Sequence, residues 1–372
     1  MRVTLIIGSL ALGGAERVMS LMANYWATHG WSITLITLVQ ERPFFDLEPG
    51  VRHVPLGVTG ESATPIAAVW NNIKRVWALR RAIQASKPQA VISFLDVTNI
   101  LTILATRGMR VPVIVSERTV PDPTIYSPGK AWVVLRRWVY PWADRVVLQS
   151  KHYKQFFSPA VRKISRVIPN PVVLPEQPRV EQNTTCVPSL PPTSEKMIIG
   201  LGRLHASKGF DLLVQAFARV APKYPNWRLT IWGEGPERDN LETQRQRLHL
   251  EDRVSLPGAT RQPYDVMQQA DMFVLSSRIE GFPNALCEAM ASGLPVISFD
   301  CPFGPREVVR DGIDGLLVPD SDVDALAQAM DNLMADEAMR LRLATRAPDV
   351  VERFGIQKVM EMWDHTIQGA LS

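Results

Sequence analysis

A helix start that could bind a phosphate lies in the segment SSRIEGFPNALCEAMASGLPVIS, residues 276–298. An apolar strand pattern ends there, and Pro283 suits the first turn of the helix that follows. Asn284, Ala285 and Leu286 would then present free amides at the helix N-terminus. Because those amides and the helix dipole favour negative charge, this turn is a candidate phosphate site.

Two carboxylates accompany this helix start, Glu280 before it and Glu288 within it. One could contact a bound sugar while the other hydrogen-bonds the vicinal hydroxyls of a ribose. The alternative is that Glu280 only caps the helix and Glu288 is a solvated surface residue. Without the neighbouring motifs, that alternative would be favoured.

A basic pair marks the start of the second half, where the strand pattern MIIGLG is followed by Arg203 and Lys208. An arginine can grip phosphate oxygens with two parallel hydrogen bonds, and a lysine adds a mobile point charge. The alternative is a solvated surface pair, but ligands of such sheets bind at the carboxyl ends of strands. Further on, Gly233 and Gly235 end another strand and would let the backbone approach a ligand.

The N-terminal segment GSLALGGAER places Gly13 and Gly14 at a predicted strand-to-helix turn. Their amides could lie close to an anion or a sugar, although the turn could also be purely structural. A Walker loop is excluded because Gly14 stands where its lysine is required, and no Ser or Thr follows. A dinucleotide fingerprint fails at Gly8-Ser9-Leu10, which disfavours a nicotinamide oxidoreductase.

The elements that must position these residues are predicted from short apolar runs that alternate with amphipathic stretches, the pattern of βαβ units. A segment with six prolines and no period, residues 171–195, interrupts the pattern as a linker. The predicted strands are 3–7, 33–39, 90–94, 111–115, 146–148, 197–201, 228–232, 272–275 and 295–299; the predicted helices include 15–28, 66–85, 323–335, 338–352 and 356–371.

Length and composition agree with two globular domains. The chain has 372 residues, 46% of them apolar and 21% charged, which exceeds the usual size of one core and excludes a disordered or fibrous protein. The three cysteines show no CxxC spacing, so neither a disulfide scaffold nor a thiolate zinc site is expected. The N-terminus reads as a buried strand rather than a signal peptide, and no transmembrane segment is expected because the uncharged run 18–40 is interrupted by polar residues and a helix break.

The charge is distributed unevenly along the chain. Residues 1–180 hold 22 Lys and Arg against 10 Asp and Glu, whereas the remainder holds 19 against 27. Such a basic half indicates an anionic partner such as phosphates or a lipid surface; the alternative is that the imbalance only tunes solubility. Between Trp70 and Arg166 there are 17 bases and only 4 acids.

Two stretches combine these bases with tryptophans, WNNIKRVWALRR (70–81) and KAWVVLRRWVYPW (130–142). Interface-lying helices use this combination, so the N-terminal domain is predicted to dock on an anionic membrane. Alternatively, the rings are core residues. That alternative is at least as strong for Trp70 and Trp77, which lie seven apart. The preferred docking candidates are therefore three rings beside Arg136 and Arg137, namely Trp132, Trp138 and Trp142.

Taken together, several motifs in order resemble those of glycosyltransferase family 4, whose members are retaining enzymes with the GT-B fold. They are GGAER, GR followed by KG, WGEGPERDNLE, EGFPNALCE and GPREVVRDGIDGLLVP, and they span almost the whole chain. The segments SFLDVTN (93–99) and CPFGPRE (301–307) resemble those of bacterial enzymes that extend lipid-linked oligosaccharides or exopolysaccharide repeats.

The resemblance implies an α/β fold of two Rossmann-like domains with parallel sheets that face a central cleft. Residues 1–180 would bind the acceptor and residues 181–354 the nucleotide sugar, while a last helix at about 355–372 would pack back on the first domain. The activity implied is transfer of a hexose or N-acetylhexosamine from a nucleotide diphosphate sugar, with a UDP-sugar favoured. The implied acceptor is a glycan hydroxyl, as in a polyprenyl-diphosphate-linked oligosaccharide.

The resemblance also implies roles for single residues. Arg203, Lys208 and Glu280 would be catalytic: the two bases bind the donor diphosphate and Glu280 the donor sugar. The remaining donor-binding residues would be Gly14, Phe282, Pro283, Asn284, Ala285, Leu286 and Glu288. The acceptor-binding residues would be Gly13, Asp96 and Arg118, and Arg118 departs from the pattern because many relatives carry His there.

No metal ion or other cofactor is expected, because no cluster with metal-ligand spacing occurs and basic side chains with a helix dipole can replace one. The expected partners are the donor, the glycan or lipid-linked glycan acceptor and the membrane surface, not nucleic acid. The implied location is the cytoplasm, at the inner face of the membrane. Two other classes stay open: a non-catalytic GT-B scaffold that binds a nucleotide sugar, and the disfavoured nicotinamide oxidoreductase.

Overall fold

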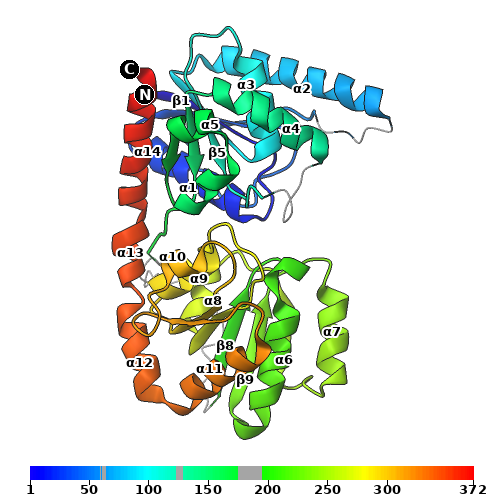
Figure 1. Cartoon of the computed structure of the whole chain (residues 1–372), viewed down its shortest axis with the longest axis vertical. Coiled ribbons are helices and arrows are strands. Elements are labelled where there is room, and N and C mark those ends of the chain that lie inside the picture. The colour runs from blue at the N-terminus through cyan, green and yellow to red at the C-terminus, as the bar shows by residue number, and fades with distance from the viewer. Residues whose placement is uncertain (59, 61–63, 123–128, 175–194) are drawn as a thin grey trace. The chain divides into compact units, whose positions relative to one another are not determined.

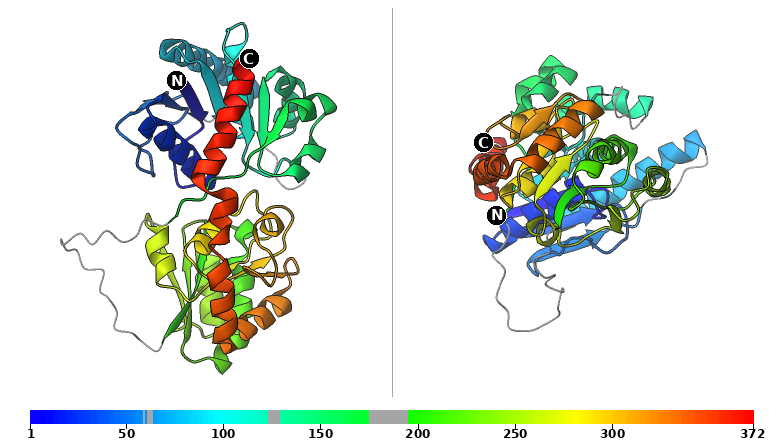
Figure 2. Two further views of the ribbon diagram at one scale, coloured as in Figure 1. Left: turned by 90° about the vertical axis from the view of Figure 1, so that its left-hand side faces the viewer. Right: turned by 90° about the horizontal axis from the view of Figure 1, so that it is seen from below.

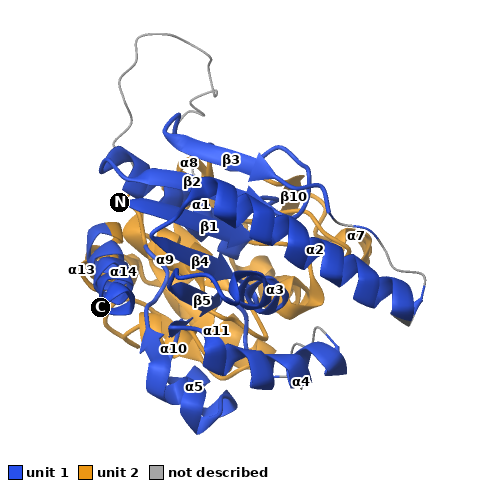
Figure 3. Cartoon of the chain, turned by 90° about the horizontal axis from the view of Figure 1, so that it is seen from above, with its two compact units in different colours: residues 1–171, 357–372 blue, residues 172–356 orange. Residues whose placement is uncertain are grey.

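The computed structural model describes residues 1–58, 60, 64–122, 129–174 and 195–372. The chain divides into two compact units (Figures 1 and 3). Unit 1 holds residues 1–171 and 357–372, and unit 2 holds residues 172–356. The predicted domain boundary at residue 180 and most of the linker lie outside the described residues.

Unit 1 is built on a parallel sheet with the strand order β3-β2-β1-β4-β5-β6-β7. Its central strands β4 and β5 are buried at every position, because helices cover both faces of a parallel sheet. The strands are β1 Arg2–Ile7, β2 Ser32–Thr37, β3 Val51–Pro55, β4 Ala90–Phe94, β5 Val113–Glu117, β6 Arg145–Leu148 and β7 Ser165–Val167; the helices are α1 Gly14–Thr28, α2 Pro65–Ser86, α3 Asp96–Thr106, α4 Lys130–Val139, α5 Pro159–Ile164 and α14 Ile356–Leu371, with 3-10 turns η1 Tyr140–Trp142 and η2 Lys151–Phe156.

The C-terminal helix α14 lies against the strands of unit 1 (Figure 2). Trp363 is fully buried and stacks on Phe94, which ends β4, with ring centroids 6.0 Å apart. The indole of Trp26 on α1 donates a hydrogen bond to Asp364 over 2.8 Å, and Arg145 donates one to the carbonyl of Gly369. The last residues of the chain therefore complete the core that begins at its first strand.

Unit 2 repeats the architecture with a parallel sheet in the order β10-β9-β8-β11-β12-β13. Its strands are β8 Lys196–Leu201, β9 Trp227–Trp232, β10 Val254–Gly258, β11 Met272–Leu275, β12 Val296–Phe299 and β13 Leu316–Val318; its helices are α6 Phe210–Val220, α7 Arg238–Arg247, α8 Pro263–Gln268, α9 Asn284–Ala291, α10 Pro305–Val308, α11 Val323–Ala335, α12 Glu337–Arg346 and α13 Asp349–Phe354, with 3-10 turns η3 Ala206–Lys208 and η4 Ala221–Lys223.

Both passages of the chain between the units run side by side. The amide of Val172 donates to the carbonyl of Phe354 over 2.8 Å, and the amide of Ile356 donates back to Val172 over 3.0 Å. Nearby, Phe354 packs edge-to-face on Phe282 at 5.5 Å. The loop that carries the candidate phosphate site is thereby joined to the segment that leaves unit 2.

The expectation of an α/β fold with two parallel-sheet domains is confirmed. The predicted strands correspond to the central strands of both sheets, with ends shifted by a few residues. The strands that sequence patterning missed, β3, β7, β10 and β13, are the edge strands of the two sheets. The single helix predicted over 338–352 is wrong: the chain forms α12 and α13, because Pro348 cannot continue a helix. No helix in the described parts of the chain is long and apolar enough to cross a bilayer.

Replacing Trp363 with Ala should lower the free energy of unfolding of unit 1 by about 3–5 kcal/mol, since it leaves a cavity between α14 and β4. Trp363→Phe is the matched control, because it keeps an aromatic ring on Phe94 and removes only the five-membered ring of the indole, whose N–H has no partner among the described residues. Its loss should be smaller than that of the alanine variant. Urea unfolding followed by circular dichroism measures both. A loss below about 1 kcal/mol in the alanine variant would show that α14 is not part of this core.

Candidate functional site

In unit 2, the loops that follow β8 and β11 meet at an ion pair. Lys208 Nζ lies 2.6 Å from Glu280 Oε1, and the hydroxyl of Ser277 donates to the same oxygen over 2.6 Å. Glu280 is only 6% exposed, whereas the Lys208 side chain is 28% exposed. The carboxylate is therefore held in one orientation from two sides, while the ammonium group keeps access to solvent.

The close approach of these loops depends on Gly209. Its backbone is left-handed, with φ of +60°, and a Cβ there would collide with the carbonyl oxygen of Ser276. The Ser276 hydroxyl donates to the carbonyl of Lys208 over 3.0 Å, and Arg278 forms a two-bonded ion pair with Asp211. These contacts fix the backbone on either side of Lys208, so its side chain extends from a rigid base.

Helix α9 begins at Asn284, one residue after Pro283, which occupies the N-cap position instead of the predicted first turn. Phe282 is buried, and Leu286 is fully buried one turn into the helix. Glu288 is 6% exposed, so the alternative that it is a solvated helix residue does not describe this structure. Nor does Glu280 act only as a cap, because its hydrogen bonds go to Lys208 and Ser277.

Arg203 follows the carboxyl end of β8 and is exposed. Within the described part of the chain, its guanidinium makes no ion pair. Arg203 thus supplies a cation that no internal carboxylate neutralises, near the start of the loop that ends at Lys208. Such a group can bind an oxyanion without first breaking an internal bond.

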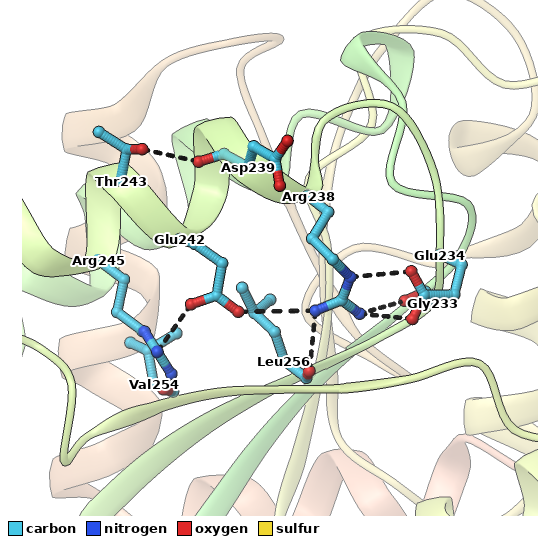
Figure 4. Close-up of polar contacts among 9 residues, drawn as sticks. All are labelled: Gly233, Glu234, Arg238, Asp239, Glu242, Thr243, Arg245, Val254 and Leu256. Carbon is cyan, nitrogen blue, oxygen red and sulfur yellow. Dashed lines mark hydrogen bonds and ion pairs between the residues drawn. The ribbon is translucent and has the colours of Figure 1, made fainter.

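The segment WGEGPERDNLE forms an internal framework, shown in Figure 4. Arg238 binds both carboxylate oxygens of Glu234, over 2.7 and 2.8 Å, and donates to the carbonyl of Leu256. A Cβ on Gly233 or Gly235 would collide with the carbonyl oxygens of Gly202 or Leu204. The expected close approach at these glycines is therefore between two backbone segments, the ends of β8 and β9, and no ligand is needed to explain it.

In unit 1, Gly13 and Gly14 lie where α1 begins. The carboxylate of Glu16 folds back onto this turn, since a Cβ on Gly13 would overlap it. Burial raises the pKa of Glu16, as does the nearby charge of Glu41 to a smaller extent. The turn that was expected to meet an anion thus already holds an acidic side chain of its own helix.

Asp96 opens α3 at the carboxyl end of β4, where it is buried and accepts a 2.7 Å hydrogen bond from the amide of Val97. The preceding residue, Leu95, has φ of 74° and ψ of 140°. A leucine rarely adopts this conformation, and its cost persists only where the surroundings enforce it. The strained turn fixes the position of Asp96, whose pKa burial raises.

A buried polar network that sequence reasoning missed lies beside Asp96. Tyr140 donates a hydrogen bond to Glu117 Oε1, and Asn99 Nδ2 donates to the Tyr140 hydroxyl over 3.0 Å. Glu117 is fully buried, and burial raises its pKa to about 7. Its Oε2 has no hydrogen-bond partner among the residues that the structure describes. The signal that could have revealed it is its place at the carboxyl end of β5, directly before the predicted Arg118.

Arg118 is also buried in unit 1. Its guanidinium carbon lies 4.4 Å from the Phe94 ring centre and 5.4 Å from that of Trp363. Nη1 donates to Asn170 Oδ1, and burial lowers the pKa of Arg118 to about 9, so the side chain stays charged at neutral pH. The structure brings Asp96 and Arg118 to neighbouring strand ends of unit 1, and it brings Lys208, Glu280 and α9 together in unit 2.

Some of the side chains that were predicted to dock on a membrane are buried, and others are exposed. Trp132 packs against a core cluster and Arg136 is buried, where it donates to the carbonyl of Pro121. Trp132 and Arg136 therefore do not belong to an exposed patch, whereas the other predicted members do, with Trp138 70% and Trp142 48% exposed beside the exposed Arg137. Trp70 and Trp77 are 57% and 66% exposed.

Helix α2 also presents a continuous exposed stripe, which we call the α2 face. With Ala78, five of its members line a shallow groove of about 410 Å³. Two other bases of α2, Arg75 and Arg80, are tied to backbone carbonyls and do not contribute to it. The α2 face consists of Ile66, Val69, Trp70, Ile73, Lys74, Trp77 and Arg81.

Glu117 gives the site a measurable pH dependence. Because its pKa is raised in the folded state, its stabilising contribution is complete below about pH 4.5 and is lost as the pH rises through about 7. Glu117→Gln has no carboxyl to ionise, so it does not lose this stability as the pH rises. The free energy of unfolding of the variant, relative to that of the native chain, should therefore rise between pH 5 and pH 8 by up to about 3 kcal/mol. Glu48→Gln, an exposed carboxylate of the same unit, is the control. Parallel pH curves for native chain and Glu117→Gln would contradict the assignment.

Two family models match the chain, one on each side of the linker. Residues 13–171 match the glycosyl transferase 4-like domain, and residues 183–350 match glycosyl transferases group 1. Together they cover most of both parallel-sheet units, apart from β1 and α14, and every motif of the candidate site.

Curated relatives of similar sequence are glycan-assembly enzymes by name. The chain is 28% identical over 98% of its length to a Campylobacter jejuni alpha-1,4-N-acetyl-D-galactosaminyltransferase that is named for a GalNAc-GalNAc-diNAcBac-PP-undecaprenol substrate, and it spans 97% of that protein. It is also 28% identical to an exopolysaccharide phosphotransferase of Streptomyces coelicolor, over 95% of this chain but only 39% of the relative.

Among solved structures, HepE from Anabaena in complex with UDP and glucose matches 99% of both chains, with a TM-score of 0.77 and 18% identity. At that identity the likeness establishes the fold. Fold, family models and relatives agree with the resemblance in the sequence motifs, and the chain belongs to the glycosyltransferases of the family 4 type with the GT-B fold.

Proposed function

We propose that the chain transfers a hexose or N-acetylhexosamine from a UDP-sugar to a glycan hydroxyl, with retention of the anomeric configuration. The proposed acceptor is a polyprenyl-diphosphate-linked oligosaccharide. The observation that carries the proposal is the Lys208–Glu280 pair at the carboxyl edge of the unit 2 sheet. It places a held carboxylate and a partly exposed cation on the loops next to the start of α9.

In the proposed reaction, the acceptor hydroxyl attacks the anomeric carbon as the bond to the diphosphate oxygen breaks. The leaving diphosphate receives the electron pair and takes the acceptor proton on the same face, so no protein base is required. Lys208, Arg203 and the amides of Ala285 and Leu286 would stabilise the charge that grows on the diphosphate, whereas the Asn284 amide already donates to the carbonyl of Phe282 over 2.9 Å. Glu280 would hold sugar hydroxyls and orient the anomeric carbon, with Glu288 on the ribose.

Because these cations can neutralise the diphosphate, we expect turnover to continue in the presence of a chelator. The named substrates of the Campylobacter relative support a lipid-linked acceptor, and the UDP-bound structure of HepE supports a UDP-sugar donor. A scaffold that only binds the donor remains the second candidate. It predicts saturable binding of UDP-sugar without sugar transfer or hydrolysis.

Lys208→Ala and Glu280→Ala should each lower kcat by about 100-fold or more, since interactions with developing charge and with the reacting sugar are lost. Lys223→Ala is the matched control: Lys223 is also ion-paired, to Asp331 over 2.8 Å, but lies elsewhere in unit 2. Transfer is measured as UDP release in the presence of acceptor. Turnover of Lys208→Ala within twofold of the native rate would refute the role of this pair.

We further propose that the α2 face docks unit 1 on the anionic inner leaflet of a membrane. Its residues recur at helical spacing, so two indoles and aliphatic side chains would enter the headgroup layer while Lys74 and Arg81 meet phosphates. Each base near an anionic surface adds about 1 kcal/mol. The two bases and two indoles together would give reversible attachment at the place where a lipid-linked acceptor is anchored.

Lys74→Glu/Arg81→Glu should lower binding to vesicles of phosphatidylglycerol and phosphatidylcholine by at least about tenfold. The double variant Lys151→Glu/Lys163→Glu changes the net charge equally at exposed bases of η2 and α5, and should change binding much less. Flotation at low and high salt measures both. Equal losses in the two variants would indicate a general charge effect rather than docking by α2, and an α4 variant, Arg137→Glu/Trp138→Ala, tests the other exposed ring.

A further inference from the structure

Arg118 is a buried cation without a counter-ion. The side chain is 7% exposed, and no carboxylate lies within ion-pair distance of it among the described residues. Its known contacts are two aromatic rings and one amide oxygen, that of Asn170. Removing a charge from water without a partner of opposite sign is costly, so such a group is retained where a ligand or a function needs it.

The contacts of Arg118 leave one edge of the guanidinium unused. Nη1 donates to Asn170, whereas Nε and Nη2 have no hydrogen-bond partner in the described ranges of the chain. These two nitrogens form the side-on edge that binds both oxygens of a carboxylate or phosphate. Phe94 and Trp363 lie near the guanidinium, so its freedom to turn is small and the fork is oriented in advance.

The neighbouring polar groups extend the same pattern. Asn170 Oδ1 also accepts a hydrogen bond from Gln149 Nε2 over 2.9 Å. Gln149 Oε1 is buried and has no donor within the part of the chain that the structure describes. Gln149, Arg118 and Asn170 follow the carboxyl ends of β6, β5 and β7. Ligands of parallel sheets bind at this edge, and two unused donors beside an unused acceptor suit an oxyanion that carries a neighbouring hydroxyl.

We propose that Arg118 binds an oxyanion of the acceptor through Nε and Nη2, with Gln149 as its polar neighbour and Asn170 as the positioning residue. This inference rests on the proposed glycosyltransferase function, in which unit 2 already supplies Arg203, Lys208 and α9 for the donor diphosphate. The shared chemistry is a phosphate or carboxylate, either in the lipid diphosphate or on an acidic sugar of the glycan.

Asn170→Asp tests the proposal without truncating Arg118. The variant keeps an oxygen for both hydrogen bonds and adds an internal carboxylate, which would neutralise the buried guanidinium. The melting temperature should stay the same or rise, while the dissociation constant for a charged acceptor should rise about tenfold or more. Arg118→Lys, which keeps the charge but loses the fork, should weaken binding similarly. Gln155→Glu is the control for one added negative charge at an exposed position of unit 1.

Three acceptors that carry the same glycan distinguish the two possible sources of the oxyanion. The first has the glycan on a short polyprenyl diphosphate, the second has it on a neutral aglycone, and the third has it on a neutral aglycone with a uronic acid added. Equilibrium binding and the donor KM are measured for each variant. The proposal predicts that both variants weaken binding of the charged acceptors only. The charged acceptor that the native chain binds more tightly identifies the source of the oxyanion. Equal weakening of all three would overturn it and leave Arg118 as a structural clamp for α14; a raised donor KM with unchanged acceptor binding would also overturn it. If the proposed function were wrong, the native chain would not transfer sugar. The acceptor-binding measurement does not depend on transfer, so the two failures can be told apart.

Discussion

The ion pair between Lys208 and Glu280 is the interaction on which the account of unit 2 depends. It joins the loops after β8 and β11, which are neighbours in the sheet although their sequences lie about 70 residues apart. Gly209 permits the contact, and Ser277 fixes the carboxylate from a second side. Because Lys208 is partly exposed and Arg203 has no internal counter-ion, this edge of the sheet has positive charge available for a diphosphate.

The carboxyl ends of the strands in unit 1 carry a different arrangement of charged side chains. Its strand ends bury an acid of raised pKa, Glu117, and a cation without a carboxylate, Arg118. The Leu95 turn adds backbone strain at the neighbouring strand. Backbone strain and buried charged groups both lower the folding stability. They occur together at functional sites, where the binding of a ligand offsets that loss. The C-terminal helix contributes as well, because Trp363 lies near both Phe94 and Arg118.

The pattern of apolar residues predicted the strands that are buried along their whole length. Central strands such as β4 and β5 are apolar at nearly every position, and they were predicted to within two residues. Edge strands such as β3, with the sequence VRHVP, are partly exposed and lack that signal. Motif spacing likewise identified Lys208 and Glu280, but not Ser277 or Tyr140, whose roles arise from contacts across the sheet. The exposure of Trp70 was left open because a spacing of seven residues is equally compatible with a core face and a surface face of a helix.

The central claim is that these groups support sugar transfer with retention and without a protein base. The most direct measurement is a nuclear magnetic resonance analysis of the product formed from a UDP-α-sugar and a polyprenyl-diphosphate-linked glycan. The anomeric coupling constant reports the configuration of the new linkage. The account predicts an α-linked product with one UDP released for each sugar transferred. A β-linked product, or UDP-sugar binding with no transfer to any such acceptor, would contradict it.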